Sequence, residues 1–518
     1  MMASNQILRE LQWAQQAIKS EGLNLHSISF YLSQPTSGCY QETENSISIN
    51  ISKEELPFFS PLLTTLAAPG KHNSSLRNLE FHKVEWDSKQ VRHLGTLLGN
   101  NQNVQHLVFR RNRFNGKSLS DLSDILKANK GIKEIMLSES GIGSVGAGLI
   151  ASALRVNDSL EELQIWEDSI GSRGAEELSK MIEVNSTLKL LTIFDSNAIT
   201  ATPLISAVLA RNRRMEVHVW SGENREKSSK VVEFEPENST LRIYKLNLSG
   251  TCRVTCSLGM NFTVKSLDMT GVRLKSRCAK EFRLVLEQNQ SLKEVNLSRT
   301  CLKDKGIVYI AAGLFKNRTL QTLHLNGNWF SGMGVEHLLC PLSRFSALQR
   351  QANITLTCIT FGGERTRIGR DGLAAVIQFL ITNETVRQLR IHDDESLRSD
   401  DFVKIFRSLE KNASLKCLSL QGCKRVEGEI LLKTIMETLQ INPWIEDIDL
   451  SRTPLQNSGR TQRIYQRLGQ NEKTEPDMDS VKDMPLAEPK SCRVFFCGQE
   501  CAGNVECNFS SLNSFSAK

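Results

Sequence analysis

A single apolar pattern returns along this chain with a period of 28 residues, and that period restricts the possible folds more than any other feature. Segments such as SLEELQI and TLKLLTI repeat the same spacing, with steps of 29 and 30 residues near the C-terminal end. With the first apolar residue of each unit taken as offset 0, the units begin at Leu76, Val104, Ile132, Leu160, Leu188, Val264, Leu292, Leu320, Val386, Leu415 and Ile445. A fixed period of about 20–50 residues is typical of stacked structural units rather than of independent globular domains.

Each unit combines a strand pattern with a helix pattern. Apolar residues fall at offsets 0, 3, 5 and 10, and Asn112 and Asn328 occupy offset 8 in two units. This spacing is the signature of leucine-rich repeats. The second half of a unit, for example GAEELSKMIEVN, has apolar residues three and four apart and predicts a helix. Each helix runs into an asparagine, such as Asn185 or Asn289, which we expect to adopt the left-handed conformation that ends many helices.

The sequence therefore predicts an α/β fold, a leucine-rich-repeat solenoid. Because one unit cannot bury its own apolar side, the units must stack into a curved array, with a parallel sheet on the concave face and helices on the convex face. The 28-residue unit resembles those of ribonuclease-inhibitor arrays. The expected organisation is a helical cap with degenerate repeats (1–75), a first repeat block (76–220), an irregular repeat with a charged insertion (221–263), a second block (264–460), a flexible linker (461–490) and a C-terminal segment (491–518).

The concave face is the expected binding surface, because residues at offsets 2, 4 and 6 point away from the core. Offset 6 places Trp166, Phe194 and Trp220 on three neighbouring strands, with Arg110 and Arg111 two units away. Aromatic residues and arginine are the residues that dominate protein interfaces. These five residues form the predicted site for a protein partner. The alternative is that the rings fold over the adjacent unit, or under the insertion, and only pack.

Two insertions and a group of acidic residues surround this predicted site. The repeat pattern is interrupted at 221–240 and at 362–370, and these segments are either recognition loops or surface insertions that the array tolerates. Glu162, Glu167 and Asp195 are expected to form a polar rim beside the aromatic residues.

Composition and motifs argue against other functional classes. The net charge of +7 is spread over 518 residues without a long Lys/Arg run, so no nucleic-acid partner is expected. The N-terminus lacks the apolar core of a signal peptide, no apolar stretch is long enough for a transmembrane segment, and the 13 cysteines are scattered. We therefore expect a cytoplasmic protein that is peripheral at a membrane only through a partner. Catalytic and metal-binding motifs are absent from the sequence, and no cofactor is expected.

The C-terminal segment SCRVFFCGQECAG has the front part of a phosphate-binding loop. Gly498 and Gly503 have the spacing of the two loop glycines, but Asn504 and Val505 stand where the motif needs Lys and Ser/Thr. The expectation for 491–518 is therefore the truncated start of a GTPase domain, followed by an unrelated tail, that binds no nucleotide.

Leucine-rich repeats joined by a linker to CRVFFCGQECAG resemble the ROCO-like group of plant proteins. In that group the repeats precede a Ras-like GTPase domain and a dimerising region. The resemblance implies an intracellular scaffold that acts in growth patterning and auxin-dependent development, of which this chain keeps the recognition arm.

A second hypothesis is that the chain regulates a GTPase in trans, because the repeat also resembles Ran-activator arrays. Arg110, Arg111 or Arg299 would then supply the arginine that stabilises the transferred phosphoryl group. Those arrays are rich in acidic residues near the C-terminus, and this chain has no acidic block there.

Overall fold

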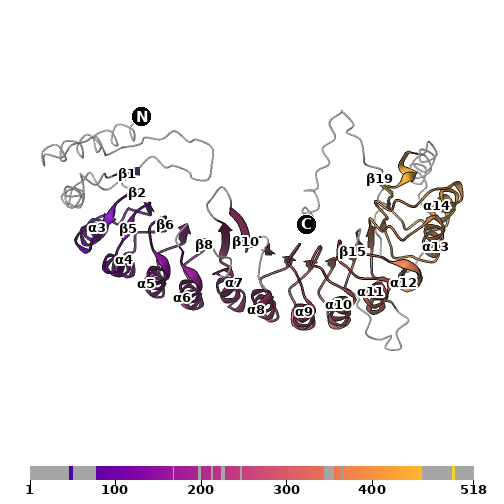
Figure 1. Cartoon of the computed structure of the whole chain (residues 1–518), viewed down its shortest axis with the longest axis horizontal. Helices are drawn as coiled ribbons and strands as arrows, with labels where there is room; N and C mark the ends of the chain where they lie inside the picture. Colours follow the sequence, from indigo (N-terminus) through magenta and orange to yellow (C-terminus); the bar gives the residue numbers. More distant parts are fainter. Residues whose placement is uncertain are drawn as a thin grey trace, which may run out of the picture.

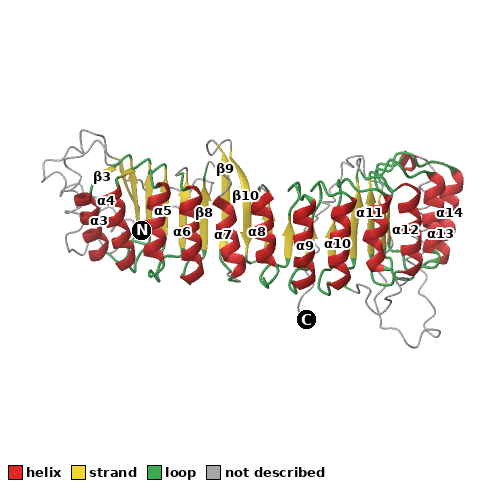
Figure 2. Cartoon of the chain, turned by 60° about the horizontal axis from the view of Figure 1, so that its bottom comes forward, coloured by secondary structure: helices red, strands yellow, loops and turns green. Residues whose placement is uncertain are grey.

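The chain forms one long arc of stacked strand–helix units, with the strands along the inner side and the helices along the outer side (Figure 1, Figure 2). This computed structural model describes residues 46–50, 77–166, 169–195, 200–211, 214–222, 228–237, 239–244, 248–343, 355–363, 366–457 and 493–495. The architecture confirms the predicted leucine-rich-repeat solenoid. Most of the predicted N-terminal cap, the whole linker and most of the C-terminal segment lie outside the described residues.

One sheet of 17 strands runs through the array, and its spatial order follows the chain order. Neighbouring strands are parallel throughout, with one exception at β10. The strands of this sheet are β1 (Ser46–Asn50), β2 (Asn78–His82), β4 (His106–Arg110), β6 (Glu134–Ser138), β7 (Glu162–Trp166), β8 (Leu190–Phe194), β9 (Glu216–Gly222), β10 (Ser228–Glu235), β11 (Thr240–Ile243), β12 (Ser266–Asp268), β13 (Glu294–Asn296), β14 (Thr322–His324), β15 (Cys358–Gly362), β16 (Gln388–His392), β17 (Cys417–Ser419), β18 (Asp447–Asp449) and β19 (Arg493–Phe495).

The helices follow the strands and cover the convex face. Two-residue strands β3 (Glu85–Trp86) and β5 (Arg113–Phe114) pair separately between strand and helix in the first units. The helices are α3 (Ser88–Asn100), α4 (Gly116–Ala128), α5 (Gly143–Leu154), α6 (Gly171–Val184), α7 (Ala201–Ala210), α8 (Leu248–Leu258), α9 (Ser276–Gln288), α10 (Asp304–Lys316), α11 (Gly332–Leu339), α12 (Gly369–Thr382), α13 (Ser399–Leu409) and α14 (Glu429–Ile441).

Alternation along most strands separates the core from the concave face, as the sequence predicts, whereas in β6, β8 and β15 the concave positions are largely buried as well. In β7, Leu163 and Ile165 are fully buried, whereas Glu162, Gln164 and Trp166 are half-buried on the other side. Apart from the half-buried Phe114, the described apolar residues at offsets 0 and 10 are also buried, and so are the apolar residues of the helices that face the sheet. One continuous core therefore runs between sheet and helices from the first described unit to the last.

The described asparagines that follow the helices do not take the predicted left-handed conformation. Asn289 has a φ of −72° and a ψ of 131°, which is extended backbone. Its side-chain oxygen accepts hydrogen bonds from the backbone N–H groups of Ser291 and Leu292 at 2.8 Å. Its Nδ2 donates to the backbone carbonyls of Leu258 and Asn261 in the preceding unit, at 2.6 and 2.8 Å. The asparagine thus turns the chain into the next strand and bonds to its neighbouring unit at the same time.

The same arrangement recurs along the array and forms a ladder of buried asparagines. In each case Nδ2 reaches the carbonyl at the end of the preceding helix, and in several also the carbonyl of the preceding asparagine. The members are Asn157, Asn185, Asn261, Asn289, Asn317, Asn383, Asn412 and Asn442. A buried backbone carbonyl must find a donor, and here the next unit supplies it.

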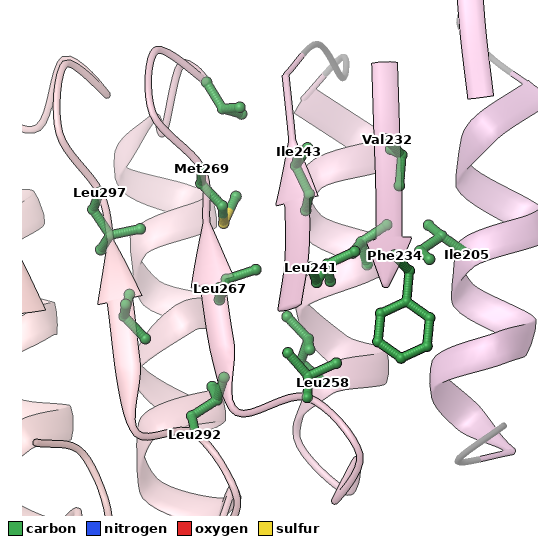
Figure 3. Close-up of a cluster of buried hydrophobic side chains, with 14 of the residues drawn as sticks. Ile205, Val232, Phe234, Leu241, Ile243, Leu258, Leu267, Met269, Leu292 and Leu297 are labelled. Atoms are coloured by element: carbon green, nitrogen blue, oxygen red, sulfur yellow. The ribbon is translucent and has the colours of Figure 1, made fainter. Parts of the chain in front are cut away.

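The charged insertion differs from the expected loop, because residues 228–235 form strand β10 within the sheet. β10 pairs antiparallel with β9 on one side and with β11 on the other. Its Val232 and Phe234 are buried and lie in the same core as Leu241 and Ile205 (Figure 3). The alternating pattern VEFE, with apolar residues on one face only, explains why this segment completes the sheet. The residues described between β9 and β11 include no helix, and α8 packs directly beside α7 in the helix row.

Removing one rung of the asparagine ladder should destabilise the array. Asn289→Ala leaves one buried N–H group, one partly buried N–H group and two buried carbonyls without this partner, so we expect the free energy of unfolding to fall by roughly 2–3 kcal/mol. Urea unfolding followed by circular dichroism measures this loss. Asn103→Ala, which changes an exposed asparagine beside the ladder, is the matched control and should be nearly neutral. Equal stability of the two variants would contradict the proposed role of the ladder.

Candidate functional site

The predicted aromatic residues lie on neighbouring strands near the C-terminal ends of β7, β8 and β9. The register places Phe194 opposite Trp220, and Trp166 opposite Ser138 of the preceding strand. Val217 and Val219 of β9 are fully buried, so Trp220 lies on the concave side, as predicted from the irregular unit. The sheet thus brings Trp166, Phe194 and Trp220 together, and we call them the aromatic row.

The middle ring of this row is not available at the surface. Phe194 is only 2% exposed, and its ring stacks on that of Trp166 with a centroid distance of 6.2 Å. Trp166 and Trp220 remain half-buried, and the indole nitrogen of Trp166 donates to Gln164 at 3.1 Å. The expectation that all three rings are exposed is therefore wrong for Phe194, which packs between its neighbours. Trp166 and Trp220 are the members that a partner can contact.

Strand β10 extends the aromatic row with residues that sequence reasoning missed. Lys230 lies opposite Trp220 and its ammonium group sits 5.4 Å from the centre of the indole ring, a cation–π contact. Tyr244, directly after β11, is 43% exposed, and its backbone N–H donates to Val231 O. The alternation in KVVEFE, followed by the turn and LRIY, is the signal that would have placed these two residues on the concave side.

A buried carboxylate holds β10 to both neighbouring strands. The side chain of Glu233 is 5% exposed and accepts from Lys230 Nζ at 2.5 Å and from the Tyr244 hydroxyl at 3.1 Å. Arg242 Nη1 and His218 Nδ1 each lie 3.5 Å from its oxygens. Burial raises the pKa of the Glu233 carboxyl, but the hydrogen bond and charge of Lys230 outweigh burial, and the pKa stays below its usual value.

The second row, near the N-terminal ends of the strands, is acidic. Glu134, Glu162 and Glu216 occupy offset 2 on β6, β7 and β9, and the register aligns them across the sheet with Leu190 between the last two. Burial, and then the charges of Glu134 and Glu216, raise the pKa of the Glu162 carboxyl. The concave positions of β6 to β9, all of them described, include no lysine or arginine. We call these three residues the acidic row.

Three histidines on concave positions of the first block lie beside glutamates. His106 Nδ1 is 2.5 Å from Glu134, His218 Nε2 is 2.5 Å from Glu216, and His82 Nε2 is 3.0 Å from Glu80. Of the predicted polar rim, Glu162 belongs to the acidic row and Glu167 lies outside the described residues. Asp195 is buried instead and accepts from the backbone N–H of Gly171 at 3.0 Å, because it closes the turn before α6.

The predicted arginines are mostly engaged in ion pairs. Arg110 Nε lies 2.5 Å from Glu80, and Arg111 Nε lies 3.2 Å from Glu139. Arg111 and Arg299 occupy the same offset of the repeat, in the loop after the strand, and both have positive φ angles (55° and 56°). Arg299 is exposed, and within the described part of the chain no ion pair engages it.

The expectations about metal sites, membrane spans and the phosphate-binding loop can be compared only with the residues that the structure describes. Within these residues no cluster of three or more His, Cys, Asp or Glu side chains has the geometry of a metal site, and no helix is long and apolar enough to cross a membrane. Gly498, Gly503, Asn504 and Val505 lie outside the described residues. The strand that precedes them, β19, pairs in parallel with β18 at the end of the repeat sheet.

Comparison with known proteins gives one strong similarity. The chain is 64% identical over 521 residues to Protein TORNADO 1 of Arabidopsis thaliana, and the match covers 99% of this chain but 38% of that protein. The family model described as "Leucine Rich repeat" matches residues 288–311 and 316–339. The chain therefore spans well under half the length of this relative.

Solved structures resemble the chain only distantly. The leiomodin-1 actin-binding site 2 is 19% identical with a TM-score of 0.27, and the match covers 32% of this chain and 90% of that one. A chain from the yeast Rad7–Elc1 complex is 14% identical with a TM-score of 0.27, covering 78% and 85%. These values support no functional comparison.

The different burial of the two stacked rings predicts different costs of removing them. Phe194→Ala opens a cavity in a fully packed position, so we expect it to lower the free energy of unfolding by about 3–5 kcal/mol. Trp166→Ala removes a half-buried ring and one stacking contact, with an expected loss of roughly 1–2 kcal/mol. Thermal or urea unfolding of the two variants checks the order. A larger loss for Trp166→Ala would mean that Phe194 is not the buried member.

The Glu233 network predicts a pH-dependent contribution to stability. Because the pKa of Glu233 is lowered in the folded chain, its ionised form stabilises the fold above the unfolded carboxyl pKa, and this contribution is lost as the pH falls through the folded pKa. Glu233→Gln should therefore cost roughly 2 kcal/mol at neutral pH and progressively less below about pH 4. Urea unfolding across this pH range measures the difference. The control Glu237→Gln changes an exposed residue in the next turn, and its free energy of unfolding should match that of the native chain at every pH.

Proposed function

Because this chain is a leucine-rich-repeat homologue of Arabidopsis Protein TORNADO 1, we propose that it is a protein-binding scaffold that holds its partner on the concave face. The partner segment contacts the sheet between β6 and β11. It offers apolar side chains to Trp166 and Trp220 and cationic side chains to the acidic row. The chain acts in the cytoplasm, in the growth patterning and auxin-related development that its resemblance to the ROCO-like group implies.

The observation that carries this proposal is the pair of half-buried indole rings on either side of a buried phenylalanine. Large aromatic groups backed by a rigid, close-packed neighbour are typical of interface hot spots. Phe194 and the sheet fix the position of Trp166, and Lys230 fixes that of Trp220, so little side-chain entropy remains to be lost on binding. The acidic row adds a charge pattern that selects among partners and steers their approach.

The acidic row also indicates why the partner must bring positive charge. The three carboxylates lie on a face whose described concave positions on β6 to β9 hold no lysine or arginine, and Glu162 has no ion pair within the described residues. Its raised pKa reflects unfavourable burial and repulsion. A lysine or arginine from a partner would relieve both, which makes the interaction selective as well as attractive.

A GTPase-regulating role in trans is the second candidate, and Arg299 is the observation in its favour. Arg110 and Arg111 are already paired with glutamates, whereas Arg299 is exposed on a loop at the edge of the sheet. An activating arginine must reach the phosphate of another protein, which an exposed and unengaged side chain can do. Of the three candidates, only Arg299 meets this requirement.

Affinity capture from plant extract, quantified by mass spectrometry, tests the concave site. The native chain is compared with Trp166→Ala, Trp220→Ala and Glu162→Gln, each first checked by circular dichroism to be fully folded at the temperature of the capture. The matched control is Trp444→Ala, which removes a tryptophan that is 53% exposed in the turn after α14, away from the concave face. We expect a partner that the native chain and Trp444→Ala retain, and that each concave variant loses by about tenfold or more.

Two other outcomes of the capture experiment point elsewhere. Equal capture by all variants would contradict binding at the concave face. A captured GTPase whose GTP turnover rises with the native chain but not with Arg299→Gly would support the second candidate instead. Glycine is the suitable replacement there, because it adopts the positive φ of this position without strain.

A further inference from the structure

A second charged surface lies on the edge of the arc, where the strands of the second block run into their helices. The loops after β12 and β13 each place basic side chains at equivalent positions. Lys275 and Lys303 share one offset in the repeat, and Arg277 and Lys305 share another. Backbone hydrogen bonds join these loops directly, from Leu274 N to Thr300 O at 2.9 Å. The repeat therefore gathers onto one edge charges that are far apart in the sequence.

The basic residues of this edge are exposed and take part in no ion pair within the described part of the chain. We call them the basic edge: Arg273, Lys275, Arg277, Arg299, Lys303, Lys305, Arg367 and Arg370. Two acidic residues are described in the first helical turns along this edge, Asp304 and Asp371, and Asp371 is exposed. Asp304 is occupied, because it accepts from the backbone N–H and the hydroxyl of Ser331. The edge thus carries a large excess of positive charge.

Helix geometry makes this accumulation of charge unfavourable in the isolated chain. Lys275 and Lys303 are the N-cap residues of α9 and α10, and neither makes a side-chain capping bond. The amino ends of helices carry a partial positive charge, where anions are stabilising and cations are not. Two adjacent helix starts therefore add to the potential of the lysines and arginines around them. A layer of anions along this edge would relieve the repulsion.

The neighbouring unit adds apolar side chains to the same edge. Trp329 is 40% exposed and Met333 is 57% exposed, at the loop positions that correspond to Cys301 and Lys305 one unit earlier. The backbone N–H of Trp329 donates to Leu302 O at 2.7 Å, which places this loop beside the basic ones. Tryptophan beside exposed lysine and arginine is typical of surfaces that contact the interface of a bilayer.

We propose that the basic edge docks the solenoid onto a membrane surface rich in anionic lipid. The cations are exposed on an outer edge rather than collected in a groove, which suits a flat array of lipid headgroups better than a single peptide strand. Each lysine or arginine near such a surface contributes about a fivefold gain in affinity at low ionic strength. Because the edge is separate from the concave face, docking leaves Trp166 and Trp220 open to a protein partner. The proposal is independent of the concave site.

Co-sedimentation of the full chain with lipid vesicles tests the proposal. Vesicles of phosphatidylcholine alone are compared with vesicles that also contain phosphatidylserine, at several salt concentrations. The variant Arg273→Gln/Lys275→Gln/Lys303→Gln/Lys305→Gln removes four charges of the basic edge. The matched control, Lys89→Gln/Arg113→Gln/Lys117→Gln/Arg173→Gln, removes four exposed charges from the same edge of the first block.

We expect the native chain to bind only the vesicles with phosphatidylserine and to be released by salt. The edge variant should bind at least about tenfold more weakly, and the control within about twofold of the native chain. Absence of binding, binding that ignores lipid charge, or equal losses in both variants would overturn the proposal. So would tighter retention on polyglutamate or RNA than on the vesicles. The salt titration uses the native chain, so it remains decisive if a variant folds poorly.

Discussion

The fold depends on hydrogen bonds to the buried backbone carbonyls at the turn after each helix. No unit can satisfy these carbonyls alone, because the donor comes from the next unit. The Nδ2 group of Asn289 bonds to carbonyls of the preceding unit, while its oxygen orders the turn into its own strand. Apolar packing is non-directional and tolerates many arrangements, but a buried carbonyl needs a donor at one place. The ladder therefore fixes the register between units, and the continuous core supplies most of the driving force. Stability and regular spacing arise from different interactions along the same array.

Much of this architecture can be predicted from one sequence because the same apolar pattern is repeated in many units, so an irregular residue in one unit does not hide it. Burial at offsets 3 and 5 holds for Leu163 and Ile165, and even for Val217 and Val219 in the irregular unit. Properties that depend on a single neighbour were not predictable. Phe194 is buried because Trp166 stacks on it, and a rule of alternation alone cannot reveal that contact. The asparagines were assigned by their usual backbone preference, yet their function comes from a carbonyl about 30 residues away, which only the stacked units bring near.

The charged surfaces show the same limitation in another form. A net charge of +7 without a basic run predicts no nucleic-acid partner, and it does not reveal where positive charge collects on the fold. The array nevertheless places Lys275 beside Lys303, because positions 28 residues apart become neighbours in adjacent loops. Charge in a solenoid has to be counted along the repeat rather than along the chain. Counted in this way, the concave strands β6 to β9 are acidic and the edge of the second block is basic. The two proposed surfaces therefore carry opposite charge and face different sides of the arc.

The strand β10 also changes the geometry of the whole arc. Strands lie about 4.8 Å apart and packed helices about 8–10 Å apart, so each ordinary unit is narrower inside than outside and bends the array toward its sheet. From β8 to β11 the sheet advances by three strands, about 14 Å, while the helix row advances by one step from α7 to α8. The inner side is locally as long as the outer side or longer, and the bend is cancelled there. Figure 1 shows the helix row bending only gently through its middle and rising steeply at both ends, toward α3 and toward α14. The two strands β9 and β10, which advance the sheet without a matching step of the helix row, thus act as a wedge that opens the horseshoe and sets the width of the mouth between its two arms.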